Sequence, residues 1–204
     1  KEVHIDPVSF NSKDEVDKYY SSREKQIEIT SGAHRKFFKE ILKIINSKNI
    51  DLEDKNVADF GCGVGNLLYI INEEVSPATC NGFDFSDTIL DLAKQNFPGG
   101  NFKKLDIYKL ANEQFDFIFC TEVLEHLLYP DKALKNILST VRNTGGGAFL
   151  SVPDGRKDSY SGHINFWSPE SWNVFVKSQA GEGVQVETGY VTSNNLYAII
   201  LFNS

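Results

Sequence analysis

The sequence predicts an α/β protein with a doubly wound parallel sheet and helices on both faces, and three observations lead to this fold class. Short apolar runs that suit buried strands alternate with segments whose apolar residues recur every three or four positions, as on one face of a helix. The run 115–120 is almost entirely apolar, which is typical of a strand covered on both faces. A glycine-rich turn at 61–65 links the first expected strand to a helix. Such alternation favours a parallel sheet.

The helices are assigned from periodicity and caps. One helix starts near Ser31, because Phe37, Ile41 and Ile45 recur at i, i+4 and i+8. Others follow the glycine turn, Ser86, Pro130 and Ser168, and the two serines are expected to act as N-caps. The helix after Pro130 is expected to stop at the glycines 145–147.

The strands are expected at 57–60, from Pro77 to Asp84, and at 101–105, 115–120, 148–152, 184–188 and 196–202. The last two form a hairpin-like pair whose connection is expected at 189–194. Residues 1–30 are polar and are expected to form an N-terminal lid or edge segment. The remainder, 31–204, is expected to be one domain.

Composition restricts the class of protein. No apolar run reaches the length of a membrane-spanning helix, and the first residues lack the apolar segment of a signal peptide. The three cysteines, Cys62, Cys80 and Cys120, are scattered, which predicts reduced thiols and a cytoplasmic protein. The net charge of −7 disfavours a nucleic-acid partner, and 155–157 is the one local basic exception. Composition does not determine the oligomeric state.

The turn 61–65 carries the first sign of a ligand site, with glycine at every second position. Glycines accept positive φ and are expected to leave N–H groups bare at the start of a helix, where anionic groups are favoured. A dinucleotide fingerprint would need glycine at the sixth position, where this chain has Asn66. Asp84 lies 23 positions after Gly61, near the separation at which a strand-end carboxylate accepts hydrogen bonds from ribose hydroxyls.

Four segments together resemble the class I S-adenosylmethionine-dependent methyltransferases: 57–66, 82–84, 105–107 and 115–126. The resemblance implies a Rossmann-like sheet of seven strands, mostly parallel, with an antiparallel last strand. It also implies that the backbone of 61–65 contacts the methionine part of S-adenosylmethionine, and that Asp59 either orders the turn or reaches the amino group of that methionine. Asp84 would bind the ribose and Asp106 the adenine amino group. The implied cofactor-binding residues are Asp59, Gly61, Cys62, Gly63, Gly65, Asn66, Asp84, Phe85, Asp106, Ile107, Thr121 and Glu122.

The run 122–126, Glu-Val-Leu-Glu-His, is similar to two subfamilies when His163 is added. One contains the O-methyltransferases of ubiquinone biosynthesis. The other methylates the terminal ribose of small RNAs with the help of a metal. On a helical turn, Glu122 would meet Glu125 and His126 at i+3 and i+4. Two interpretations follow: a divalent metal site (magnesium or manganese, with zinc as an alternative) formed by Glu122, Glu125, His126 and His163, or a metal-free site in which Glu122 shapes the cofactor pocket.

The expected reaction is methyl transfer to oxygen. Alignment of the two reactants lowers the barrier to such a displacement by about 7 to 11 kcal/mol. A hydroxyl acceptor must also lose its proton. The candidate catalytic residues are Glu125, His126 and His163, with either histidine as the base, although His163 also fits a structural role in its loop. The acidic chain favours a small hydroxylated acceptor, such as a sugar or phenol, over RNA. A nicotinamide-dependent oxidoreductase and a cofactor-binding subunit without catalysis are the rival classes.

Overall fold

The computed structural model describes residues 32–109, 112–143 and 145–203, and within these ranges seven strands form one sheet in the order β3-β2-β1-β4-β5-β7-β6. The expected N-terminal lid or edge segment, 1–30, lies outside the described residues. The strands are β1 (Asn56–Phe60), β2 (Thr79–Asp84), β3 (Asn101–Lys104), β4 (Phe117–Thr121), β5 (Gly147–Pro153), β6 (Gln185–Thr192) and β7 (Asn195–Leu201).

The sheet is parallel from β3 to β5, whereas β7 runs antiparallel to β5 and β6 antiparallel to β7. This confirms the mixed seven-stranded sheet that the resemblance implied. The chain moves outward from β1 through β2 to β3, then returns to place β4 on the other side of β1. The loops that follow β1 and β4 therefore diverge, and a crevice opens at the carboxyl ends of these two strands, as is usual for ligand sites in such sheets.

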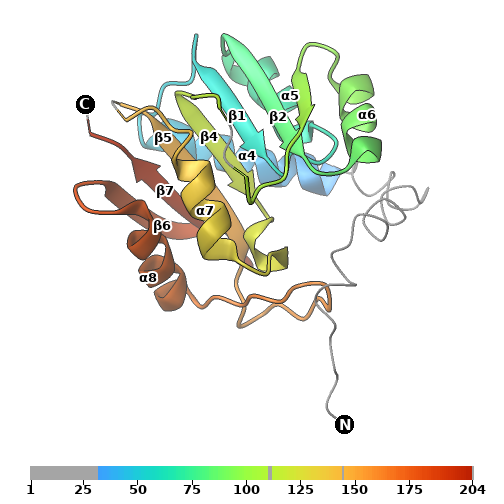
Figure 1. The fold of residues 1–204 in the computed structure, drawn as a ribbon. Helices are drawn as coiled ribbons and strands as arrows, with labels where there is room; N and C mark the ends of the chain where they lie inside the picture. The colour runs from blue at the N-terminus through green and yellow to red at the C-terminus, as the bar shows by residue number, and fades with distance from the viewer. Residues whose placement is uncertain (1–31, 110–111, 144, 204) are drawn as a thin grey trace.

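Five α-helices within the described ranges cover the two faces of the sheet (Figure 1). They are α4 (Gly32–Ser47), α5 (Asn66–Val75), α6 (Asp87–Asn96), α7 (Pro130–Leu138) and α8 (Pro169–Ala180). Buried residues of α4, α5 and α6 belong to one core cluster, and those of α7 and α8 belong to the other. Among the described helices, none combines the length and the apolar content that crossing a bilayer requires.

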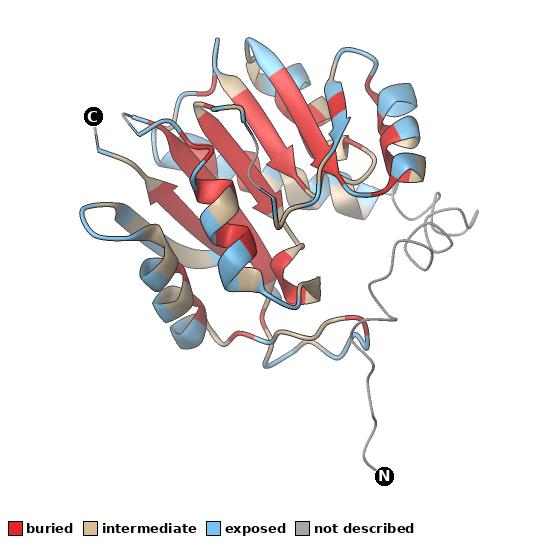
Figure 2. Ribbon diagram, in the orientation of Figure 1, coloured by how far each residue is buried: buried red, intermediate tan, exposed pale blue. Residues whose placement is uncertain are grey.

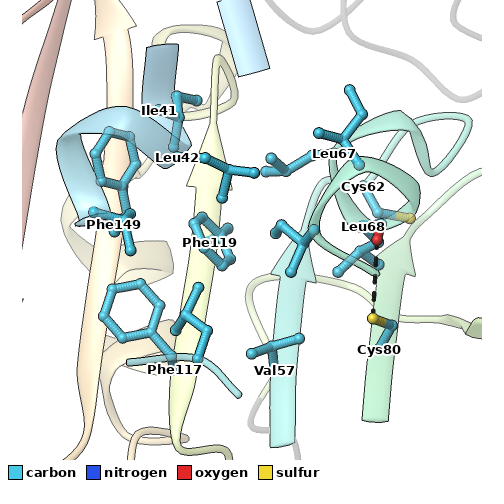
Figure 3. Packing of buried hydrophobic residues seen from close by; sticks show 14 of the residues in the cluster. Ile41, Leu42, Val57, Cys62, Leu67, Leu68, Cys80, Phe117, Phe119 and Phe149 are labelled. Atoms are coloured by element: carbon cyan, nitrogen blue, oxygen red, sulfur yellow. Dashed lines mark hydrogen bonds between the residues drawn. The ribbon is translucent and has the colours of Figure 1, made fainter. Parts of the chain in front are cut away.

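The two apolar layers meet the sheet at its central strands, which are buried while the outer sides of the helices are exposed (Figure 2). On the α4 side, Phe119 and Phe149 lie beneath Ile41 and Leu42, and Leu68 of α5 lies above Cys80 (Figure 3). These side chains are almost completely removed from solvent. The expectation that the strand ending at Cys120 is covered on both faces is confirmed.

Two expected boundaries were wrong. The connection between the last strands was placed at 189–194, but β6 continues through Gly189 to Thr192. Gly189 pairs with Tyr197, and a Cβ there would lie 2.7 Å from the tyrosine ring, so this glycine serves close packing and not a turn. The helix expected to stop at 145–147 ends already at Leu138, where the hydroxyls of Ser139 and Thr140 donate to the last helical carbonyls.

We expect Phe119→Ala to lower the free energy of unfolding by about 3 to 5 kcal/mol, because the ring is fully buried against two aromatic neighbours, Phe117 and Phe149, and its removal leaves a cavity. The matched control is Val174→Ala, since that side chain is 67% exposed and should change the free energy by less than about 0.5 kcal/mol. Urea unfolding followed by circular dichroism measures both. Equal effects in the two variants would contradict the packing described here.

Candidate active site

A cavity of about 380 Å³ lies at the carboxyl ends of β1 and β4. Its walls come from three parts of the chain that are distant in sequence. The glycine turn and Asp59 form one wall, Thr121, Glu122 and Asn195 form another, and the first turns of α4 form the third. Seven of the twelve expected cofactor residues line it: Asp59, Gly61, Cys62, Gly63, Asn66, Thr121 and Glu122.

Sequence reasoning missed five residues of the lining: His34, Phe37, Phe38, Leu67 and Asn195. The periodicity of the two phenylalanines indicated only that they face the sheet. No local signal marks His34 or Asn195, because their place at the cavity depends on how α4 and β7 pack against the strands.

The remaining expected cofactor residues lie at the neighbouring strand ends. Asp84 closes β2, and its carboxylate accepts from the N–H groups of Gly63 (3.3 Å) and Ser86 (3.1 Å). Asp106 follows β3, where it accepts from the Tyr108 N–H at 3.0 Å and pairs with Lys109. Phe85 is exposed and Ile107 is half-buried. Gly65 is buried at the start of α5, and a Cβ there would lie 2.7 Å from the Phe102 ring.

The glycine turn packs closely against Val123. Gly61 has a φ of 79°, and a Cβ on it would lie 2.3 Å from a methyl group of Val123, so no other residue fits without a shift. The expectation of bare N–H groups was wrong at several positions. The N–H groups of Gly61 and Cys62 both donate to Phe83 O (2.7 and 3.0 Å), because the turn folds back on β2, and the Gly63 N–H donates to Asp84.

Asp59 is an unsatisfied acid at the base of this cavity. Its side chain is 2% exposed, and Oδ1 has no hydrogen-bond partner. Burial, reinforced by the nearby negative charge of Asp84, raises the pKa of Asp59 to about 8. A buried carboxyl oxygen without a partner is costly, so a ligand that donates a hydrogen bond or brings a positive charge is favoured here.

Glu122 points into the same cavity from a strained backbone position. Its φ is 55°, in the left-handed region, which costs a residue with a side chain about 1 to 2 kcal/mol. Ser151 Oγ donates to one carboxylate oxygen and Asn195 Nδ2 donates to the other, both at 2.8 Å. Burial raises the pKa of Glu122 to about 7, although the two hydrogen bonds act in the opposite direction.

The expected helical turn from Glu122 to His126 is not formed, because the left-handed backbone at Glu122 interrupts it. A short 3₁₀ turn begins only at Leu124 and ends at His126. Of the four expected metal ligands, the structure groups Glu125, His126 and His163, with one possible ligand atom from each within 4.8 Å of the others. We call these three residues the histidine–glutamate cluster. Glu122 is directed to Ser151 and Asn195 and lies outside this cluster.

The cluster has a buried carboxyl group at its centre, and its three side chains form no hydrogen bonds with one another. Glu125 is 1% exposed and neither carboxyl oxygen has a partner. Its Oε1 lies 3.9 Å from the Nε2 atom of both His126 and His163. Burial, followed by the charge of Glu122, raises the pKa of Glu125 well above its usual range. Burial and the neighbouring His163 lower the pKa of His126 to about 4, so His126 is neutral at pH 7.

Backbone hydrogen bonds bring the distant loop to the cluster. The N–H groups of Ile164 and Asn165 both donate to Glu125 O, at 2.9 and 3.1 Å. The Asn165 amide also donates to Leu127 O at 2.6 Å. His163 is thereby held against the turn that carries Glu125 and His126, which sequence spacing alone could not show.

Comparison with known proteins agrees with this architecture. The family model described as a methyltransferase domain matches residues 30–181. A ubiquinone biosynthesis O-methyltransferase of Coxiella burnetii (strain Dugway 5J108-111) is 34% identical over 117 residues, which are 54% of this chain and 48% of that protein. A trans-aconitate 2-methyltransferase of Rhizobium rhizogenes is 32% identical over 101 residues, 47% of this chain and 38% of that protein. The chain thus spans about half the length, or less, of these curated relatives.

Among solved structures, the magnesium protoporphyrin IX methyltransferase of Synechocystis PCC 6803 with bound S-adenosylmethionine superposes with a TM-score of 0.71. The match covers 100% of both chains at 16% identity, so it shows a shared fold. The family model covers most of the chain, and the sheet is the mixed seven-stranded one that the resemblance implied. The chain therefore belongs to the class I S-adenosylmethionine-dependent methyltransferases.

Proposed function

We propose that the protein transfers the methyl group of S-adenosylmethionine to an oxygen atom of a small hydroxylated molecule, such as a sugar or a phenol. The main observation in support is that the cavity and the histidine–glutamate cluster are adjacent. Glu122 lines the cavity, and its charge acts on the buried Glu125 of the cluster. A ligand in the cavity would thus lie beside groups that can accept a proton.

The cavity fits S-adenosylmethionine. The unpartnered Asp59 oxygen can accept a hydrogen bond from an ammonium group, and Gly63 lines the cavity without a side chain, at a position where a Cβ would stand in open space. Two carboxyl groups, Asp59 and Glu122, line the cavity and favour a cationic ligand. When bound, S-adenosylmethionine supplies an electrophilic methyl group on a positively charged sulfur. Asp84, at the end of the adjacent strand β2, is the residue that we assign to the ribose hydroxyls.

The cluster supplies proton acceptors for the methyl acceptor's hydroxyl. His126 is neutral at pH 7, and its Nδ1 lies 3.1 Å from Gly162 O, an arrangement in which Nδ1 donates and Nε2 keeps its lone pair. The Nε2 of His163 lies at the same distance, 3.9 Å, from the same Glu125 oxygen. We assign the role of base to one of these two histidines. A hydroxyl group needs such a base more than a neutral amine does.

A divalent ion is the second component that we propose for the cluster. Each histidine has its Nδ1 within hydrogen-bonding distance of an oxygen atom, from Gly162 or from Asp158, which is the usual arrangement when Nε2 binds a metal. Both Glu125 oxygens are without partners. Because Glu122 is engaged elsewhere, the donor set is one carboxylate and two imidazoles, which favours manganese or zinc over magnesium. An ion there would lower the pKa of a bound hydroxyl group.

The charge distribution favours a small acceptor over RNA. The lysines at the β3 end of the sheet, Lys103, Lys104 and Lys109, each pair with an acidic side chain. Arg156, in the basic segment 155–157, donates two hydrogen bonds to the fully buried Asp154, at 2.9 and 2.8 Å. Its charge therefore neutralises an internal carboxylate and is not available as a free phosphate contact.

The assignment of Asp84 predicts that Asp84→Ala weakens binding of S-adenosylmethionine by about 1.5 to 3 kcal/mol, because hydrogen bonds to a charged group are lost. Isothermal titration calorimetry measures the affinity. Asp91→Ala is the control, since Asp91 is an exposed residue of α6 that pairs only with Lys94 among the contacts described. Thermal unfolding without ligand shows whether the variant is folded. Unchanged affinity in a folded Asp84→Ala protein would refute the assignment.

The acceptor proposal is tested by measuring S-adenosylhomocysteine release with a panel of sugars, phenols and amines and with short RNAs carrying a free terminal ribose. We expect turnover with a hydroxylated small molecule, and loss of most of that turnover in His126→Ala or His163→Ala. General acid–base catalysis contributes about 10²- to 10⁴-fold, which sets the expected loss when the base is removed. Methylation of RNA alone would replace the small-molecule proposal with the terminal-ribose alternative.

The metal proposal is tested by titrating chelator-treated protein with Mn²⁺ and Zn²⁺ in a calorimeter. We expect one ion per chain, and a large loss of affinity in Glu125→Gln because this variant removes the only carboxylate donor of the cluster. Glu122→Gln should keep the ion, since its carboxylate bonds to Ser151 and Asn195. Equal binding in all three proteins, or none in the wild type, would exclude an ion at this cluster.

A further inference from the structure

Asp158 contacts the histidine–glutamate cluster from the loop between β5 and α8, and the sequence analysis assigned it no role. Its side chain is 9% exposed. One carboxylate oxygen, Oδ2, is hydrogen-bonded to Nδ1 of His163. The other, Oδ1, accepts from the Tyr160 N–H at 3.0 Å, and the Asp158 N–H donates to Asp154 O at 3.1 Å. The carboxylate is therefore held at both of its oxygens.

The direction of the hydrogen bond determines which nitrogen of His163 carries the proton. An ionised carboxylate only accepts, so the hydrogen in this contact belongs to Nδ1. A neutral imidazole has one N–H group, and Nε2 must then hold a lone pair. That Nε2 lies 3.9 Å from Glu125 Oε1, in the cluster. The Tyr160 ring, 4.8 Å from the His163 ring, packs against the imidazole and restricts its rotation.

We propose that Asp158 is a positioning residue, which selects the Nδ1–H tautomer of His163 and so directs the Nε2 lone pair into the histidine–glutamate cluster. The use of that lone pair, as a base or as a metal ligand, rests on the proposed function. The tautomer itself does not. His126 reaches the same state through a backbone carbonyl, Gly162 O, so the two imidazoles are oriented alike by different partners.

The removal of Asp158 should release this constraint. A histidine side chain in water prefers the Nε2–H tautomer, which would turn an N–H group toward Glu125 and remove the lone pair from the cluster. The loop would keep its other attachments, because the Ile164 and Asn165 N–H groups still donate to Glu125 O. A purely structural role for Asp158 would therefore change stability without changing the tautomer of His163.

The first test is nuclear magnetic resonance of the full chain labelled with ¹⁵N-histidine, recorded without metal at about pH 8, above the ordinary range of histidine titration. The chain has four histidines, and the spectrum of His163→Gln identifies the resonances of His163. We expect a protonated Nδ1 and an unprotonated Nε2 in the wild type, and a shift toward Nε2–H in Asp158→Ala. Asp91→Ala should leave the pattern unchanged.

Two results would overturn the proposal: an Nε2–H tautomer of His163 in the wild type, or an unchanged tautomer in a folded Asp158→Ala protein. If Asp158→Ala does not fold, Asp158→Asn takes its place, since its amide oxygen can accept the same hydrogen bond without the charge. The Nδ1 proton resonance should then move upfield, because a neutral acceptor binds that proton more weakly. An unmoved resonance would equally count against the proposal.

The second test measures Mn²⁺ and Zn²⁺ affinity of the same chelator-treated proteins. Loss of an outer partner of a histidine ligand typically costs about 10- to 100-fold in metal affinity, and we expect this loss in Asp158→Ala, partial recovery in Asp158→Asn and none in Asp91→Ala. Wild-type affinity in Asp158→Ala would argue against a positioning role. If the wild type binds neither ion, the metal part of the proposed function fails, and the tautomer measurement alone decides the role of Asp158.

Discussion

The site depends on the reversal of strand order between β1 and β4. Because β2 and β3 lie on one side of β1 and β4 lies on the other, the chain segments that leave β1 and β4 diverge and open a crevice between them. Asp59 and Gly61 stand at one side of this crevice, and Thr121 and Glu122 at the other. Binding of the cofactor and removal of the acceptor's proton, as proposed above, both require these two strand ends to be neighbours.

Around this crevice the protein buries acidic groups that its own cations do not neutralise. Asp59 and Glu125 are almost fully buried with unpartnered oxygens, and their pKa values are raised mainly by burial. By contrast, the buried Asp154 is paired with Arg156 and its pKa is lowered to about 2. The difference separates an acid that is satisfied within the fold from acids whose oxygens are left without a partner.

The sequence predicted the parts of the molecule whose causes are local. Ser86 caps α6 and Ser168 caps α8, because a serine side chain before a helix accepts from the N–H groups of its first turn. Gly61 was recognised because few residues accept its backbone conformation. Two predictions from local pattern were wrong. Helical spacing predicted that Glu122 meets Glu125 and His126, but the left-handed backbone at Glu122 interrupts the helix. Gly189 was interpreted as the start of a turn, whereas it is needed for packing within a strand.

The sequence by itself thus determined the fold class, the methyltransferase family and the strand-end acids, since periodicity and glycine placement act over a few residues and leave a local pattern. Only the tertiary structure decided which side chains share a site. Asn195 reaches Glu122 across 73 positions. His163, which is hydrogen-bonded to Asp158, meets Glu125 because backbone hydrogen bonds tie its loop to the 3₁₀ turn. Such contacts arise from strand pairing and loop docking between distant segments, which no short stretch of sequence encodes.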